Sequence, residues 1–268
     1  GPQLWNILFD TIIRSLEALD VDLVEYANDL VILVRGDNRN DIEAKAIEAM
    51  SVLVSRCEGV KLEIASNKTV MMLLKGTLRG WNPIVQVQGE RLQYVSNFKY
   101  LGITFGERLS VSPHVRSVGQ RAWDAFAKVC RLAGSGWGIG FRELRALYKG
   151  VFLGILLYAV PSWAHCLNNR QWTQLGSFQR RALIKVNGAY RTAPTAAMPV
   201  LAGVLPVRLE GWRRWAEFRV KRRMPVVIQG ILDVPEGGGG PVVAGGLLVD
   251  ALLTCWQREW DEAPIGRL

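Results

Sequence analysis

The sequence is poor in the residues that build disulfide frameworks and metal centres. Its four cysteines lie far apart with no paired spacing: Cys57, Cys130, Cys166 and Cys255. Its two histidines, His114 and His165, stand away from any cysteine pair. These spacings argue against a zinc site and against a disulfide-stapled domain. No signal-peptide pattern opens the sequence, so we expect free thiols in a reduced intracellular compartment.

The sequence also lacks a long unbroken apolar run. The best candidate, residues 151–160, ends at Pro161 and falls short of the roughly 20 apolar residues that a membrane-spanning helix needs. We therefore expect no membrane partner. An initiator methionine is missing as well, and Gly1-Pro2 opens directly into an apolar segment. We expect the chain to be a fragment of a longer polypeptide.

Acidic residues are the scarcer charge, with 24 Asp and Glu against 33 Lys and Arg, and the net charge of +9 favours polyanionic partners. Residues 1–60 are mainly acidic, whereas residues 170–225 carry many bases and only two acids, Glu210 and Glu217. Carboxylates that hold metal ions beside a phosphate-binding surface would produce this pattern. Two solvated faces of unrelated helices would produce it too, and charge alone slightly favours them.

The 268 residues, 49% of them hydrophobic, can form one large domain or two ordinary ones. Helices are predicted through residues 4–13 and from Asn40-Asp41 to Gly59. The apolar face predicted for the second helix consists of Ile42, Ala46, Ile47, Met50 and Val54. Strands are predicted over residues 21–25, 30–34, 69–74, 84–88, 91–95 and 98–103.

After about residue 110 the apolar period becomes helical throughout. Helices are predicted near residues 112–129, 141–160, 170–187, 195–203, 206–223 and 247–260, with a loop at 134–138 and a glycine-rich linker at 237–241. The fold class is therefore α+β. We expect a mixed region over residues 1–110, a helical region over 111–190 and a basic helical region over 191–268.

The segment Tyr26-Ala27-Asn28-Asp29 lies between two apolar, β-branched runs, which predicts a β-hairpin with a polar tip. Such a turn exposes adjacent side chains on a rigid support, where carboxylates can hold the two Mg²⁺ ions that phosphoryl transfer needs. Asn-Asp between strands is also ordinary turn chemistry, because both residues tolerate left-handed backbone. Taken alone, the segment is better interpreted as a plain turn.

Further motifs follow in the order found in the reverse transcriptases of non-LTR retrotransposons. The matching segments are residues 1–10 (end of motif B), 26–30 (motif C), 62–69 (motif D) and 98–103 (motif E, the primer grip), then 151–164, 188–192 and 201–206. Each motif is weak by itself. Their order and spacing together resemble the Pol polyprotein of type-one retrotransposable elements that insert into ribosomal RNA genes.

The resemblance implies a fragment of an RNA-directed DNA polymerase: the end of the palm, a helical thumb and a connecting region. It implies two Mg²⁺ ions in the complete enzyme, and an RNA template, a DNA primer, deoxynucleoside triphosphates and the remaining polyprotein as partners. It also implies an intracellular location, nuclear when the enzyme acts on genomic DNA. Motif A, the fingers and any endonuclease would lie outside this chain.

The resemblance assigns roles at the hairpin tip. Asp29 would be a catalytic, metal-binding carboxylate of motif C, and Asn28 takes the place of the first motif C Asp. An amide oxygen carries no charge and holds Mg²⁺ less well than a carboxylate, so we expect impaired or absent polymerisation. The alternative function is a catalytically inactive nucleic-acid-binding remnant. Tyr26 would pack near the incoming nucleotide or against its own strand.

The resemblance also assigns residues farther along the chain. Lys68 would lie near the nucleotide phosphates and assist proton transfer, or be an exposed turn lysine. Tyr100 and Gly102 would shape the primer grip, where a glycine lets the nucleic-acid backbone approach. Six arginines are candidate phosphate contacts: Arg180, Arg181, Arg213, Arg214, Arg222 and Arg223. Trp163 is expected in the core. A helical interaction domain unrelated to nucleic acids is a third interpretation.

Overall fold

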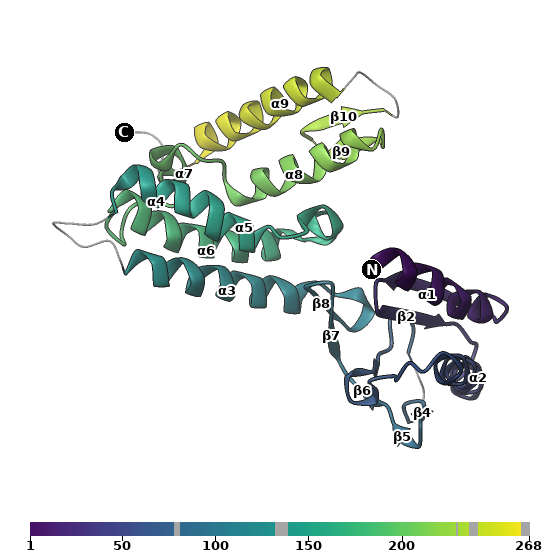
Figure 1. The fold of residues 1–268 in the computed structure, drawn as a ribbon. Coiled ribbons are helices and arrows are strands. Elements are labelled where there is room, and N and C mark those ends of the chain that lie inside the picture. The colour runs from purple at the N-terminus through teal and green to yellow at the C-terminus, as the bar shows by residue number, and fades with distance from the viewer. Residues whose placement is uncertain (78–80, 132–138, 229, 236–240, 264–268) are drawn as a thin grey trace. The chain divides into compact units, whose positions relative to one another are not determined.

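The structure is a computed structural model that describes residues 1–77, 81–131, 139–228, 230–235 and 241–263. It combines helices with short strands, which confirms the predicted α+β class. The chain divides into two compact units. The first comprises Gly1–Phe98 and Gly106–Leu109, and the second comprises Lys99–Phe105 and Ser110–Leu268. Figure 1 shows the elements of each unit.

The first unit is built on helices α1 (Pro2–Glu17) and α2 (Arg39–Gly59) and the hairpin of β1 (Val21–Tyr26) and β2 (Asp29–Val34). Its core joins Ile12 and Leu16 of α1 to Ala49 and Leu53 of α2. Helix α2 begins earlier than predicted because Asn38, rather than Asn40-Asp41, accepts a hydrogen bond from the Asp41 N–H at 3.0 Å.

The buried stripe of α2 overlaps the predicted one only in part. Met50 is buried as predicted, and Ala46 and Val54 pack against the core, whereas Ile47 is 47% exposed. The other buried side chains of the helix are those of Ala49, Leu53 and Cys57. Both stripes have helical spacing, so the sequence period permits either of them. The partner surfaces decide between them, because α2 packs against α1 and the strand β4 (Gln86–Val87).

The remaining strands of this region are shorter than predicted. β3 (Val70–Met71) pairs in parallel with β6 (Gln93–Tyr94), and β4 forms a hairpin with β5 (Glu90–Arg91). The single strand predicted over residues 98–103 is wrong. It is a hairpin of β7 (Asn97–Tyr100) and β8 (Ile103–Gly106), because the chain turns at Leu101-Gly102. The division between the two units falls within this hairpin.

The second unit is mainly helical. Its elements are α3 (Ser112–Cys130), α4 (Phe141–Leu147), a π-helical turn (Tyr148–Phe152), α5 (Leu153–Leu156), α6 (Asn169–Asn187), α7 (Ala197–Ala202), α8 (Val207–Lys221), β9 (Val226–Ile228), β10 (Leu232–Val234) and α9 (Pro241–Glu262). Each predicted helix is present, but the one predicted over 141–160 is divided and its last α-helical segment ends at Leu156, and the one predicted near 247–260 begins at Pro241. The strands β9 and β10 are not predicted from the sequence. The predicted loop at 134–138 and residues 237–240 of the predicted linker lie outside the described residues, and α9 starts at Pro241.

Helices α3 and α6 lie side by side and parallel (Figure 1). Gln171 donates to the Ser112 hydroxyl at 2.8 Å near their first turns, and the Arg181 guanidinium lies 4.3 Å from the Trp123 ring centre farther along. Trp163 is 1% exposed, which confirms its predicted place in the core. Trp172 and Trp215 are buried as well.

The helical stretch Phe141–Ser162 is long and apolar enough to cross a membrane by length and composition. The apolar run of residues 151–160 considered from the sequence is only the second half of this stretch, which begins at Phe141. Part of the stretch is core: Tyr148 and Phe152 stack with ring centres 5.3 Å apart, and Leu156 is fully buried. Packing within the second unit therefore accounts for much of its apolar character.

Candidate functional site

The hairpin of β1 and β2 has a two-residue tip. The register runs from Val21 opposite Val34 to Tyr26 opposite Asp29, which leaves Ala27 and Asn28 as the turn. Ala27 has a φ of +54°, a strained value for a residue other than glycine that persists only where the surroundings hold it. The indole N–H of Trp5 donates to the Ala27 carbonyl at 2.9 Å, so α1 holds this turn.

The side chains of the tip point to solvent. Tyr26 is 63% exposed, so strand packing is not its role in this structure. Asn28 and Asp29 are exposed too, and among the described residues no ion pair or side-chain hydrogen bond engages the Asp29 carboxylate. Asp20 differs: Lys45 donates to its carboxylate at 2.8 Å and lowers its pKa. The first unit thus presents one unpaired carboxylate on a braced turn.

The donor set at this tip does not fit two divalent metal ions. The turn offers the Asp29 carboxylate and the neutral Asn28 amide, and hard cations such as Mg²⁺ take several oxygen ligands, preferably charged ones. In the described ranges no three His, Cys, Asp or Glu side chains form a group that could hold a metal ion. Any two-metal site would need carboxylates beyond those described.

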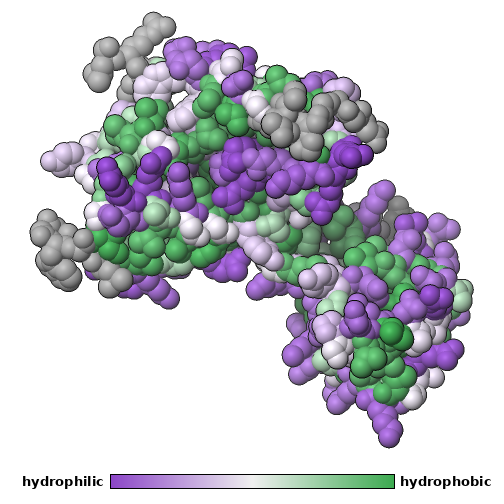
Figure 2. All heavy atoms as spheres, turned by 45° about the horizontal axis from the view of Figure 1, so that its top comes forward, coloured by the Kyte–Doolittle hydropathy of each residue, from purple (hydrophilic) through white to green (hydrophobic). Residues whose placement is uncertain are grey.

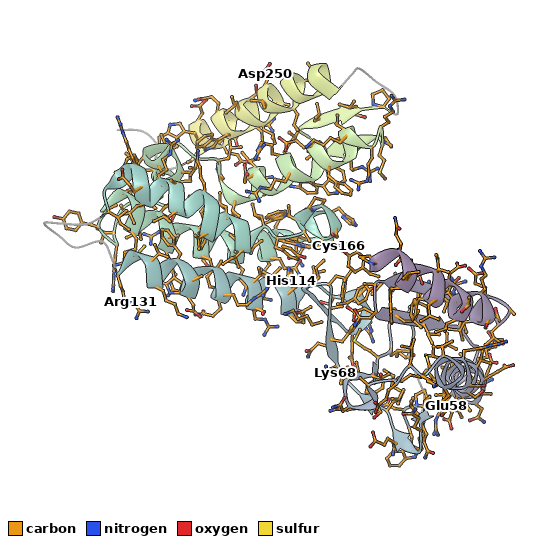
Figure 3. The ribbon with its side chains drawn as sticks, viewed as in Figure 1. Glu58, Lys68, His114, Arg131, Cys166 and Asp250 are labelled. Carbon is orange, nitrogen blue, oxygen red and sulfur yellow. The ribbon has the colours of Figure 1, made fainter. Side chains whose placement is uncertain are left out.

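Lys68 lies at the end of the 3₁₀ turn Ser66–Lys68 and is exposed (labelled in Figure 3). The Ser66 hydroxyl of this turn donates to the Glu90 carboxylate of the β4–β5 hairpin, and Thr69 donates to the Ala65 carbonyl at 3.0 Å. The turn is therefore fixed while the Lys68 ammonium stays accessible. Both roles considered for Lys68 remain open as predictions.

The hairpin of β7 and β8 turns at Leu101 and Gly102, with φ values of +46° and +84°. A Cβ on Gly102 would come within 2.9 Å of Tyr158 Cε1, and the Tyr158 hydroxyl donates to the Leu101 carbonyl at 3.4 Å. Gly102 is thus needed here for its positive φ and for contact with Tyr158, reasons that the sequence analysis did not consider. Tyr100 is half-buried in β7.

His114, in the first turn of α3 (Figure 3), anchors the same hairpin. Its side chain is fully buried, its Nδ1 accepts a hydrogen bond from the Thr104 N–H at 3.3 Å, and its ring lies edge-on to Trp163 at 5.2 Å. Burial, and to a lesser extent the charge of Arg121, lowers the pKa of His114 to about 4. His114 is therefore neutral in the folded chain at neutral pH.

We expect this histidine to make folding pH-dependent. The unfolded chain binds a proton near pH 6.5 and the folded chain only near pH 4, so the free energy of unfolding falls as the pH drops between these values. The full loss is about 3 kcal/mol by linkage. Denaturant unfolding of the full chain across this pH range measures it. His114→Gln should flatten the slope, whereas the exposed His165→Gln should keep it; equal slopes in all three proteins would contradict the assignment.

Three of the six candidate phosphate contacts are engaged within the second unit. Arg180 donates to the Arg191 carbonyl at 2.6 Å, and Arg213 and Arg214 donate to the Glu210 carboxylate at 2.8 Å. Burial alone would raise the pKa of Glu210, but these hydrogen bonds outweigh it and lower the pKa. The spacing of Glu210 three and four residues before Arg213 and Arg214 indicates these two pairs in the sequence, whereas the loop partners of Arg180 have no local signal.

The other three candidates are exposed. Arg181 lies over Trp123, Arg222 lies 3.8 Å from the Phe218 ring centre, and Arg223 follows α8 with a φ of +57°. Figure 2 shows a band of hydrophilic side chains between hydrophobic ones on the visible face of the second unit. Five further exposed bases on the parallel pair α3 and α6 are not among the predicted phosphate contacts: Arg116, Arg121, Lys128, Arg170 and Lys185. The first three could have been predicted from the sequence, because they lie between the apolar residues that form the buried stripe of α3 and therefore face solvent.

The segment 201–206, one of the segments that carry the family resemblance, is fixed by hydrogen bonds from side chains that were not among the predicted site residues. Gln179 is 4% exposed; its amide donates to the Tyr148 hydroxyl and the Leu205 carbonyl at 2.9 Å each. Its oxygen accepts from the Val207 N–H at 2.7 Å. Arg145 donates to the Gly203 carbonyl at 2.6 Å. The segment 201–206 is thus conformationally fixed by α4 and α6.

The tip of the β1–β2 hairpin and the Leu101-Gly102 turn of the β7–β8 hairpin both lie in the part of the chain whose sequence matches a known protein family. Residues 1–105 match the family of the reverse transcriptase (RNA-dependent DNA polymerase) domain. The chain belongs to the Pol polyproteins of R1-type non-LTR retrotransposable elements. No solved structure matches it.

The relatives cover nearly the whole chain. It is 31% identical over 270 residues to a 115 kDa protein in the type-1 retrotransposable element R1DM of Drosophila melanogaster, covering 98% of this chain and 26% of that protein. It is 31% identical over 257 residues to the Pol polyprotein of element R1 3 of Nasonia vitripennis, covering 91% and 67%. It is 29% identical over 272 residues to the Pol polyprotein of element R1 of Bradysia coprophila, covering 100% and 27%. The chain thus spans about a quarter of the first and third relatives.

Proposed function

We propose that this chain is part of an RNA-directed DNA polymerase that extends a DNA primer on an RNA template with deoxynucleoside triphosphates, acting in the nucleus within a longer polyprotein. One observation carries the proposal. Within the stretch that matches the reverse transcriptase family, α1 holds a strained hairpin turn that presents the unpaired Asp29 carboxylate to solvent. Residues in sparsely populated conformations cluster at functional sites, because surrounding structure must stabilise them.

The second candidate function is a nucleic-acid-binding remnant that has lost catalysis. It is favoured by the amide of Asn28 beside Asp29, which leaves the tip with a single carboxylate. In both functions the helical unit would bind template and primer. The exposed bases of α3 and α6, which include Arg181, supply the charge for this, and Arg222 and Arg223 add to it.

Phosphate binding by α3 and α6 predicts a salt-dependent affinity that depends on particular bases. We expect the variant with Arg121, Lys128 and Lys185 all changed to Gln to bind an RNA–DNA duplex about 10- to 100-fold more weakly than the unchanged chain at moderate salt. The slope of log affinity against log salt should fall by about two to three, because each lost phosphate contact removes roughly 0.7–0.9. Fluorescence anisotropy with the full chain measures both.

The matched control neutralises three exposed bases of the first unit, Arg56, Lys61 and Lys75, again to Gln. This control has the same net charge as the α3–α6 variant, so it should keep most of the affinity. Equal weakening by both variants would show that net charge, and not the α3–α6 surface, attracts the nucleic acid. Binding without salt dependence would contradict both candidate functions and favour an unrelated helical interaction domain.

A further inference from the structure

The segment Gly188–Thr195, which we call the Tyr190 loop, follows α6 in a fixed conformation. Gly188 ends the helix with a φ of +59°, and the Ala193 N–H donates to the Tyr190 carbonyl at 3.1 Å, which closes a turn. Arg180 donates to the Arg191 and Ala193 carbonyls at 2.6 and 2.9 Å, and to the Thr195 hydroxyl at 3.0 Å. One guanidinium thus holds three points of the loop, which is the geometry of a rigid support.

This loop displays an aromatic ring to solvent. Tyr190 is 86% exposed, the highest value among the large hydrophobic side chains of the described ranges. Its neighbour Arg191 is exposed as well. An exposed aromatic ring contributes little to the stability of its own fold, because it buries almost no area. A rigid loop that presents such a ring beside a cation is suited to stacking on a planar ligand that carries negative charge.

The surroundings favour a polyanion over a protein surface. Between Glu143 and Glu210 the sequence has no acidic residue, while it has eight bases in that interval: Arg145, Lys149, Arg170, Arg180, Arg181, Lys185, Arg191 and Arg208. The Tyr190 loop lies within this acid-free stretch. Basic side chains near an exposed aromatic ring attract nucleic acid and repel basic protein surfaces.

A groove of about 530 Å³ adjoins the loop and gives the ligand a second place to bind. Arg180 and Thr195 line it on the side of the loop, and Trp256 and Trp260 line it from α9. The acid in its wall, Glu259, is paired with Arg208, so its charge is compensated. The volume lies in the range of sites that hold small ligands, which includes a single nucleotide.

We propose that the Tyr190 loop and this groove form a binding site for single-stranded nucleic acid. One unpaired base stacks on the Tyr190 ring, Arg191 contacts an adjacent phosphate, and a neighbouring nucleotide occupies the groove beside Trp256 and Trp260. The strand must be single, because bases of a duplex are stacked on each other and their faces are closed to a side chain. The site deepens the proposed function, on which it rests for the choice of RNA as that strand.

The test compares Tyr190→Ala and Tyr190→Phe in the full chain. The probe is a short single-stranded RNA that carries a fluorescent adenine analogue, and a duplex of the same length serves as the second ligand. We expect Tyr190→Ala to weaken single-strand binding about 5- to 100-fold and to abolish quenching of the analogue. Tyr190→Phe should stay within about twofold, because stacking needs the ring and not the hydroxyl. Duplex affinity should be unchanged in both variants.

The matched control is Trp81→Ala, which removes another exposed aromatic ring, 82% exposed, from the first unit. It should leave both affinities unchanged. The proposal is overturned if Tyr190→Ala binds the single strand like the unchanged chain, if it weakens single strand and duplex equally, or if Tyr190→Phe is as weak as Tyr190→Ala. Failure of the proposed function is a separate result, namely duplex binding without dependence on salt or on α3–α6 bases.

Discussion

Replacing Gln179 by Leu is expected to lower the free energy of unfolding of the second unit by about 3–5 kcal/mol, since buried polar groups that lose their partners each cost about 1–3 kcal/mol. Leucine has a similar volume, so the loss comes from hydrogen bonding rather than from a cavity. The change strands the Tyr148 hydroxyl, the Leu205 carbonyl and the Val207 N–H. Because the last two flank Pro206, the start of α8 loses its anchor to α6.

Denaturant unfolding of the full chain, followed by the fluorescence of the buried tryptophans of the second unit, measures this loss. The matched control is Gln120→Leu, since Gln120 is also a helix glutamine but is exposed, and its side-chain amide donates to the exposed Asp124 at 2.8 Å. It should change the free energy by no more than about 0.5 kcal/mol. A Gln179→Leu variant as stable as the control would show that water or rearranged partners satisfy these groups.

Local signals made parts of this fold predictable. The helix α6 has Asn168 as its N-cap, a capping box with Gln171, and Gly188 at its C-terminus, so its predicted bounds agree with the structure to within a residue. The sequence of the β1–β2 hairpin consists of two apolar runs around a polar turn, and the tip of the hairpin lies at the predicted residues. In both elements, the residues that define the structure are neighbours in the sequence.

Other parts depend on partners that the sequence does not identify. The turn at Leu101-Gly102 is not predicted because residues 98–103 are apolar enough to continue as one strand, whereas the reversal depends on the positive φ of both residues and on the contact of Gly102 with Tyr158. The buried stripe of α2 departs from the predicted one at Ile47 for the same reason. Several faces of this helix have apolar residues at helical spacing, and contact with α1 and β4 decides which of them is buried. Tertiary contacts override local preference in both elements.

The candidate site was predictable in type but not in detail. The order of weak motifs led to the tip with Asp29, whereas nothing local showed that Trp5 would hold the turn. Among the arginines, charge alone could not separate Arg180 and Arg213, which bind within the fold, from Arg181, which is exposed. Separating these arginines requires the positions of their hydrogen-bond partners. The partners of Arg180 lie in a loop, and the partner of Arg213 lies one helical turn away.

The Asn28→Asp substitution is expected to have the largest effect on activity. A second carboxylate beside Asp29 would complete the charged tip that motif C of the family implies, because this position now holds a neutral amide. Metal ions that stabilise transition-state charge are worth several kcal/mol, so the restored ligand should raise primer extension by at least about 100-fold. The braced turn should accept it, because Asp has nearly the shape of Asn and this position is exposed.

Two controls isolate the charge at the tip from charge in general. Asn38→Asp adds the same charge to the same unit at the N-cap of α2, where Asn and Asp are about equally good, and should leave extension unchanged. Asp29→Asn on top of Asn28→Asp should remove the gain, because it leaves the tip again with one carboxylate. If Asn38→Asp also raised primer extension, or if the Asn28→Asp variant kept its higher extension after Asp29→Asn, the effect would not depend on paired carboxylates at the tip.

Primer extension by the longer enzyme is therefore the most direct test of the role of position 28. The assay uses the Pol polyprotein of element R1 of Bradysia coprophila with this chain in place of its matching segment, since that relative aligns over the whole chain. We predict little or no extension with Asn28 and strong extension with Asn28→Asp on an RNA template. If the chimera stays inactive with Asp at position 28 while the unaltered relative extends the primer, Asn28 is not what limits polymerisation. That result would contradict the proposed polymerase function and favour the non-catalytic remnant.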